Sequence, residues 1–280
     1  MSLNTGVPSI RTMSIGLMGL GSIAVVRTMI MIKAGGSNGV VALSDLGGFV
    51  IVAVAAAIVI LIARRFEHGS GLRSQWTLIG LGMTAFALGD ATWSFMELAL
   101  KVEVPYPGMP DLFYIGEYVF VCAALLMAAG SYRNLLDIRP AAGIAGTAGV
   151  VMVVLLYVGL LEPYLLSDPL LSAPELVASV FYPVADVALL MAPSIFLVLV
   201  VAKLEAGRLG WPWWFVVAGA TTLAISDATF SWLAASNSYV AGSLVDYGWM
   251  LAHVAFAVGA SIALDVVTSA AEFEAVIGSA

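Results

Sequence analysis

The sequence predicts an all-α integral membrane protein with eight transmembrane helices, arranged as two parallel four-helix repeats. Three observations indicate this fold. The 280 residues are 61% hydrophobic and only 10% charged, whereas a soluble domain carries about 25% charged residues. Apolar runs of about 20 residues, the length that crosses a bilayer, recur along the chain. Two segments inside such runs are similar, with seven of thirteen positions identical: GMTAFALGDATWS at 82–94 and GATTLAISDATFS at 219–231.

The apolar runs set the positions of the expected spans. We place these at 12–32, 45–63, 76–100, 112–132, 141–161, 176–202, 212–235 and 244–267. The first run is interrupted by Arg27 and several glycines, and it has no evident cleavage site, so we expect a retained helix rather than a signal peptide. The single cysteine, Cys122, excludes an intrachain disulfide.

Basic residues alternate between the expected loops, which predicts the orientation. They gather on one side at Arg11, Arg64, Arg65, Arg73, Arg133, Arg139, Lys203 and Arg208, whereas the loops on the other side are acidic or neutral. Basic loops remain in the cytoplasm. With eight spans, both termini are therefore expected there.

The duplication extends beyond the thirteen-residue segment. When Asp90 is aligned with Asp227, Trp76 falls opposite Trp213, and downstream Asp111 and Tyr114 correspond to Asp246 and Trp249. We therefore expect one membrane domain made of two repeats, 1–140 and 141–280, the second with a short cytoplasmic tail. An even number of helices in each repeat makes the two parallel, as in transporters whose sites lie between the halves.

Polar residues in the spans define the candidate site. An aspartate near the centre of a transmembrane helix costs about 2.5–3.5 kcal/mol on insertion scales, and such residues mark functional sites. The 3.6-residue period places several of them in stripes on one helix face. We expect them to converge on a polar, aromatic-lined site in the outer half of the bundle. The predicted ligand-binding residues are Asp90, Trp93, Glu97, Asp111, Tyr114, Glu117, Tyr118, Tyr182, Asp186, Asp227, Asp246, Trp249 and His253.

Each of these features also has a structural interpretation. Asp111 and Asp246 begin helices, where acidic residues serve as ordinary caps. Asp90 and Asp227 can hold helices together through interhelical hydrogen bonds, and an isolated His253 is typical of a buried histidine with satisfied hydrogen bonds. Tryptophans near helix ends are typical of the interfacial aromatic belt, which is the default interpretation of Trp76, Trp211, Trp213 and Trp214.

Several classes of protein are excluded or disfavoured. No lysine lies in the last two spans, so a retinal Schiff base of the rhodopsin type has no attachment point. His68 and His253 are far apart and thiols are unpaired, so no metal site is expected. Motifs such as GxSxG, HExxH or a P-loop do not occur. We expect no catalytic residues and no nucleic-acid partner, and the sequence specifies no cofactor.

Two stretches resemble a known family. GDATWSFMEL at 89–98 and PYPGMPDLFYIGEY at 105–118 are similar to the multi-pass N-terminal sensory module of bacterial diguanylate cyclases and phosphodiesterases, the GGDEF and EAL proteins. Tyr182, Pro183 and Asp186, together with 243–260, extend the resemblance over roughly 45–267. No GGDEF or EAL output domain follows in this chain. The resemblance implies a sensor in a prokaryotic plasma (inner) membrane, with Asp90, Trp93, Pro107, Asp111, Tyr114, Asp186, Asp246 and Trp249 as the carried-over positions.

The leading hypothesis is a membrane-embedded sensory or ligand-binding module that signals to a cytoplasmic protein. Its expected partners are the lipid bilayer and either a cytoplasmic signalling protein or a membrane complex. The two halves differ in their acidic residues: the first half has Glu97 and Glu117, whereas the second has Ala234 and His253. We therefore expect the first, acid-rich half to bind the ligand. The alternatives are a proton- or ion-coupled transporter of small solutes and a structural subunit of a larger complex.

Overall fold

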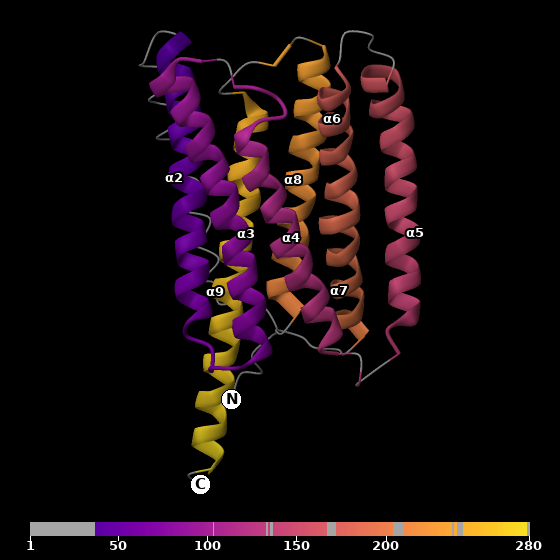
Figure 1. Ribbon diagram of the computed structural model, residues 1–280. Helices are drawn as coiled ribbons and strands as arrows, with labels where there is room; N and C mark the ends of the chain where they lie inside the picture. Colours follow the sequence, from indigo (N-terminus) through magenta and orange to yellow (C-terminus); the bar gives the residue numbers. More distant parts are fainter. Residues whose placement is uncertain are drawn as a thin grey trace.

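The computed structural model describes residues 37–278, apart from 103, 133, 135–136, 167–171, 204–209, 237 and 240–242. This part of the chain is all-helical and contains no strand. The helices run roughly side by side along one direction (Figure 1). The first expected span, 12–32, lies outside the described residues.

Within the described residues, the bundle contains eight α-helices and three π-helical segments. The π-segments continue or join the α-helices: η1 extends α3, η2 extends α5, and η3 joins α6 to α7. The α-helices are α2 (Ser37–Ala63), α3 (Gly71–Ser94), α4 (Met109–Gly130), α5 (Arg139–Leu156), α6 (Ala173–Ala185), α7 (Ala192–Lys203), α8 (Trp211–Ala235) and α9 (Leu244–Gly278), and the π-segments are η1 (Phe95–Leu100), η2 (Tyr157–Leu166) and η3 (Asp186–Met191).

Six helices of the described region are long and apolar enough to cross a membrane. They are Ser44–Ala63, Met109–Gly130, Arg139–Pro163, Ala173–Lys203, Trp211–Ala234 and Leu244–Ala270, and they coincide with six of the expected spans. The expected span at 76–100 is helical as α3 and η1 and runs beside α2 and α4 (Figure 1). This helix is more polar than the others and is not among the six. The length and composition of these helices are those of a multi-pass membrane protein.

Local sequence determines where these helices begin. A proline in the first turn opens α4, α5, α6 and α8, where its missing N–H costs no helical hydrogen bond. The hydroxyl of Ser70 caps α3 by accepting from the Arg73 N–H. Ser172 and Glu175 form a capping box at the start of α6. These signals, rather than the apolar pattern alone, fix the loop positions.

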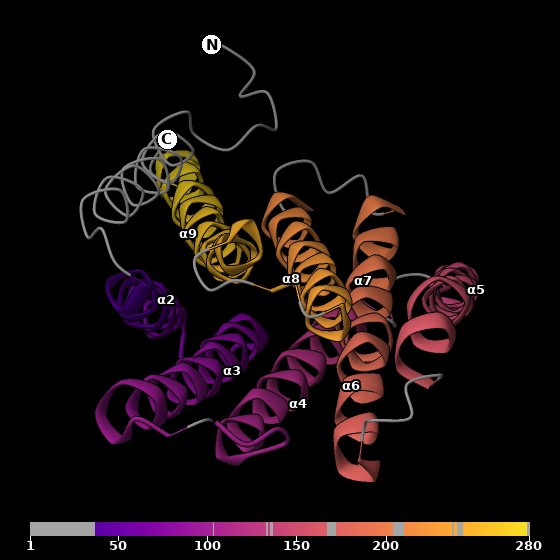
Figure 2. The ribbon, with the colours of Figure 1, turned by 90° about the horizontal axis from the view of Figure 1, so that it is seen from above.

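Six helical columns pack in a ring that brings the two ends of the chain segment together. α3 packs on α2 and α4, α8 packs on α9, and α9 closes the ring against α2. On the other side, α4 contacts η3 and α7, while α5 stands outside against α7 (Figure 2). Residues distant in sequence therefore face one another inside the ring.

Trp76 and Trp213 pack against each other in the core. Their rings are stacked, with centroids 5.4 Å apart and planes 10° from parallel, and they are 0% and 3% exposed. Assigning these two residues to the aromatic belt was wrong, because each side chain points into the bundle instead of toward the interface. Trp214, by contrast, is 52% exposed.

The two copies of the repeated segment use their first glycine in the same way. A Cβ at Gly82 would lie 2.8 Å from Val121 Cγ2 and 3.2 Å from the Glu117 carbonyl oxygen. At Gly219 a Cβ would lie 2.5 Å from Phe256 Cε1 and 2.8 Å from the Ala252 carbonyl oxygen. Each glycine thus lets its helix approach the next one closely, as small residues do in membrane bundles.

We expect Gly82→Ala and Gly219→Ala each to destabilise the protein by about 1–3 kcal/mol, because the added methyl group overpacks a helix contact. Gly219→Ala should cost more, since its Cβ would lie closer to a backbone oxygen, 2.8 Å against 3.2 Å at Gly82. Gly146→Ala on α5 is the matched control, because nothing lies within 4 Å of its Cβ position. Unfolding in lipid or mild detergent would measure the difference, and equal stability of all three variants would contradict the close approach.

A candidate polar site between the helices

Most of the predicted site residues hydrogen-bond to one another inside the helix ring. The bonds occur in separate groups. Four of these groups join helices that are distant in sequence. The buried members include Glu117, Asp186 and His253, which are at most 1% exposed. Buried polar groups require partners, because an unpaired group in a low-dielectric interior loses its hydration without compensation.

The most connected group surrounds the hydroxyl of Tyr118 on α4. This hydroxyl lies 2.9 Å from Asp186 Oδ1, at the start of η3, and 3.1 Å from Asp227 Oδ2 on α8. The indole N–H of Trp249 on α9 donates to Asp227 Oδ1 at 2.5 Å. Four elements therefore meet around two carboxyl groups.

Asp90 on α3 is the counterpart of Asp227 in the first copy of the repeated segment. Its Oδ1 accepts a hydrogen bond from the Tyr114 hydroxyl at 3.0 Å. Tyr114 and Trp249 occupy corresponding positions in the sequence alignment of the two repeats, and each donates to the aspartate of its own repeated segment. Asp90 and Asp227 thus do make the interhelical hydrogen bonds that their structural interpretation predicts.

Glu117 and His253 form a buried pair between α4 and α9. The His253 Nε2 lies 2.9 Å from Glu117 Oε1. The other imidazole nitrogen, Nδ1, lies 2.6 Å from the Trp249 carbonyl oxygen. A carbonyl oxygen can only accept, so Nδ1 carries a proton. The second contact also needs one proton, held either by Nε2 or by the carboxyl group. Phe86 packs on the imidazole with a centroid separation of 4.4 Å.

Asp111 and Asp246 each make contacts beyond their own helix start. Asp111 Oδ2 accepts from the Gly108 N–H at 2.6 Å, which is the expected cap, and Oδ1 also accepts from the Tyr182 hydroxyl on α6. Asp246 accepts from Ser44 on α2 at 2.5 Å and from Tyr239 at 3.0 Å. Capping alone therefore accounts for only part of the role of these two carboxylates.

Trp93 and Glu97 form a pair of their own. The Trp93 indole N–H donates to Glu97 Oε2 at 2.7 Å within the helix made by α3 and η1. Both side chains are partly exposed. This hydrogen bond is local, so it does not join the groups that link distant helices.

Sequence reasoning missed two hydrogen-bond partners of Asp246. Ser44 and Tyr239 hold Asp246, but an isolated serine and a loop tyrosine give no periodic signal. Tyr106, in the loop before α4, is a third polar residue near this end of the bundle. Burial raises its pKa to about 12, so its hydroxyl keeps the proton at neutral pH.

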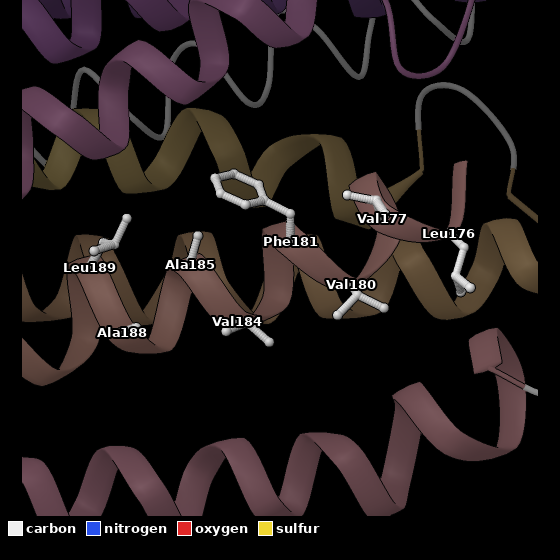
Figure 3. Close-up of a pocket in the computed structure, with 8 residues that line it drawn as sticks. All are labelled: Leu176, Val177, Val180, Phe181, Val184, Ala185, Ala188 and Leu189. Atoms are coloured by element: carbon white, nitrogen blue, oxygen red, sulfur yellow. The ribbon is translucent and has the colours of Figure 1, made fainter. Parts of the chain in front are cut away.

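Two hollows in the described part of the chain are lined mainly by apolar side chains. One follows the apolar side chains of α6 and η3, from Leu176 to Leu189 (Figure 3), and the other lies on α5 between Pro140 and Ala148. Neither is lined by a predicted site residue. In the first hollow, Phe181 also makes an edge-on contact with Tyr118, with centroids 6.0 Å apart. The outward-opening polar cavity stays a prediction.

Comparisons with protein-family models, curated proteins and solved structures found no match to this chain.

We expect Glu117→Leu or His253→Leu alone to destabilise the protein by about 3–5 kcal/mol, because each leaves a buried polar or charged partner unpaired. The double variant should recover much of this loss. Glu97→Gln is the control, since that carboxylate is partly exposed and locally bonded, and it should change stability by less than about 1 kcal/mol. Additive losses in the double-mutant cycle would show that the pair does not interact.

Proposed function

We propose that this protein is a sensory or ligand-binding module of a prokaryotic plasma (inner) membrane, and that it signals to a cytoplasmic partner. In this proposal the chain consists of two parallel four-helix halves, 1–140 and 141–280, and the polar groups between them form the sensing site. The observation that carries the proposal is that paired polar residues join helices of one half to helices of the other.

Matched contacts support the division into halves. In the first half Tyr114 donates to Asp90, and in the second Trp249 donates to Asp227. The close approaches at Gly82 and Gly219 correspond in the same way. Contacts between the halves also correspond, because α4 packs on η3 and α7 while α9 packs on α2. Such agreement is expected of a duplicated four-helix unit.

Polar bonds cross from one half to the other at four places. Tyr118 reaches Asp186 and Asp227, and Glu117 pairs with His253. The remaining two are Tyr182 with Asp111 and Ser44 with Asp246. A ligand or ion that competes for these partners changes the relative free energy of the arrangements of the halves, which is how binding shifts a population.

α9 is the proposed output. It carries Trp249 and His253 in the polar groups and continues past the other helices at the end of the bundle where α2 ends (Figure 1). That end also carries Arg64, Arg65 and Arg73, so the distribution of basic residues favours a cytoplasmic location. A movement of α9 would thus reach a cytoplasmic protein.

A proton- or ion-coupled transporter is the second candidate. It is favoured by carboxyl groups from both halves that meet between parallel repeats, the arrangement in which transporters place coupling ions. Flux into proteoliposomes that disappears in Asp227→Asn would favour transport over sensing.

We expect Asp227→Asn to move the cytoplasmic end of α9, because it alters the partner of Trp249. Spin labels at Thr268→Cys and Arg64→Cys, in a Cys122→Ser background that removes the native thiol, would report the distance between α9 and the end of α2. Glu97→Gln is the control and should leave the distance distribution unchanged. Identical distributions in all variants would contradict a signalling role for the polar groups.

A second measurement searches for the ligand. Thermal stability of the wild type and of Asp90→Asn/Asp227→Asn would be compared against a panel of small solutes, lipids and pH values. We expect at least one condition to stabilise the wild type and not the variant.

A further inference from the structure

We propose that Tyr118, Asp186 and Asp227 form a binding site for a single proton, held between the two carboxyl groups through the tyrosine hydroxyl. The proposal identifies the proton as an ion bound at the polar site. Its role as the sensed signal rests on the proposed function, whereas its presence at the site does not.

Counting protons around Tyr118 gives the first reason. The hydroxyl lies within hydrogen-bond distance of Asp186 Oδ1 and of Asp227 Oδ2. A phenol has one proton to donate and can otherwise only accept, and an ionised carboxylate can only accept. Tyr118 therefore satisfies one carboxylate at most. The other contact is attractive only if that carboxyl group carries a proton and donates to the phenol oxygen.

The remaining hydrogen bonds indicate which carboxyl group holds the proton. Asp227 receives the Trp249 N–H at Oδ1 and lies beside Tyr118 at Oδ2, so both of its oxygens have donors available. Asp186 is 0% exposed, and its Oδ2 has no hydrogen-bond partner among the described residues. An ionised Asp186 would leave a charged buried oxygen without a donor, whereas in neutral Asp186 the same Oδ2 is an uncharged carbonyl oxygen, which costs less to leave unpaired. The better arrangement has neutral Asp186 donating to Tyr118, which donates to ionised Asp227.

The same geometry allows the proton to change sides without any outside group. The proton on Asp186 Oδ1 moves to the Tyr118 oxygen while the phenol proton moves to Asp227 Oδ2. One O–H bond breaks and one forms at each transfer, and the total charge is conserved. Since Asp186 begins η3 and Asp227 lies on α8, the transfer shifts negative charge from one element to the other.

Other titratable groups surround this site on every side. Glu117 and Tyr118 face it from α4, and Glu117 is paired with His253 from α9. Tyr182 approaches from α6 and donates to Asp111, and Tyr106 faces Asp227 from the loop before α4. The Glu117–His253 pair also requires a proton in its contact, so the proton of the Tyr118 group must be distinguished from it by substitution.

Loss of this proton predicts a change in helix packing. Two ionised carboxylates would then lie on either side of the Tyr118 hydroxyl, with the Trp249 N–H as the only other donor shown, in a low-dielectric interior where like charges repel strongly. The contact between α4 and the second half would weaken, or water would enter to solvate the carboxylates. Proton binding is thereby linked to the relative position of the halves.

Infrared spectroscopy of the full chain in lipid tests the site, because the carbonyl stretch of a protonated carboxyl group is separate from that of a carboxylate. We expect wild type at neutral pH to show a protonated-carboxyl band that is lost in Asp186→Asn and lost on alkaline titration. Tyr118→Phe should shift the band and the pH at which it disappears. Glu117→Gln should leave the band present, which separates it from the Glu117–His253 pair.

In a Glu117→Gln background, a band that persists in Asp186→Asn and also in Asp227→Asn, or the absence of any such band, would overturn the proton site. If Asp186→Asn does not fold, the Tyr118→Phe titration decides, and an unchanged band and titration there would overturn it as well. A band that behaves as expected without any pH-dependent α9 movement would retain the bound proton and contradict only the sensory role.

Discussion

The cost of placing carboxyl groups inside a membrane bundle governs this structure. Asp90, Glu117, Asp186 and Asp227 lie among helices whose other residues are largely apolar, so none of them can rely on bulk water. Each meets a tyrosine, tryptophan or histidine from another helix. Since apolar side chains gain little by leaving lipid for a helix interface, these polar partners and the close packing at glycines determine which helices adjoin.

The way those partners are shared gives the polar groups their capacity for change. A carboxylate with several fixed donors is simply a stable anion. Asp186 relies on the single hydroxyl of Tyr118, which also lies beside Asp227, and its other oxygen has no hydrogen-bond partner among the described residues. Such groups respond to protons, ions or polar ligands because an added donor completes their hydrogen bonding. The hydrogen-bond deficit, more than the number of charges, makes this region the candidate site.

Much of the helical organisation was predictable from the sequence, since apolar runs define spans and prolines mark helix starts. The repeat alignment placed Tyr114 and Trp249 in corresponding positions, but the hydrogen bond that each donates to the aspartate of its own repeated segment was found only in the structure. Contacts between distant helices were not predictable in this way. Ser44 meets Asp246 across 202 positions of sequence, and no local pattern specifies that meeting. Trp76 and Trp213 lie near helix starts, where an interfacial position is the common outcome, yet the ring of helices turns both inward.

The length of α9 has a mechanical consequence. About 25 residues separate His253 from Gly278 within this one helix, which at 1.5 Å per residue is a rigid arm of roughly 37 Å. A tilt of only about 5° around the polar groups would displace the far end by roughly 3 Å. In the proposed sensor, a rearranged hydrogen bond near Trp249 would thus become a displacement comparable to the diameter of a water molecule at the far end of α9.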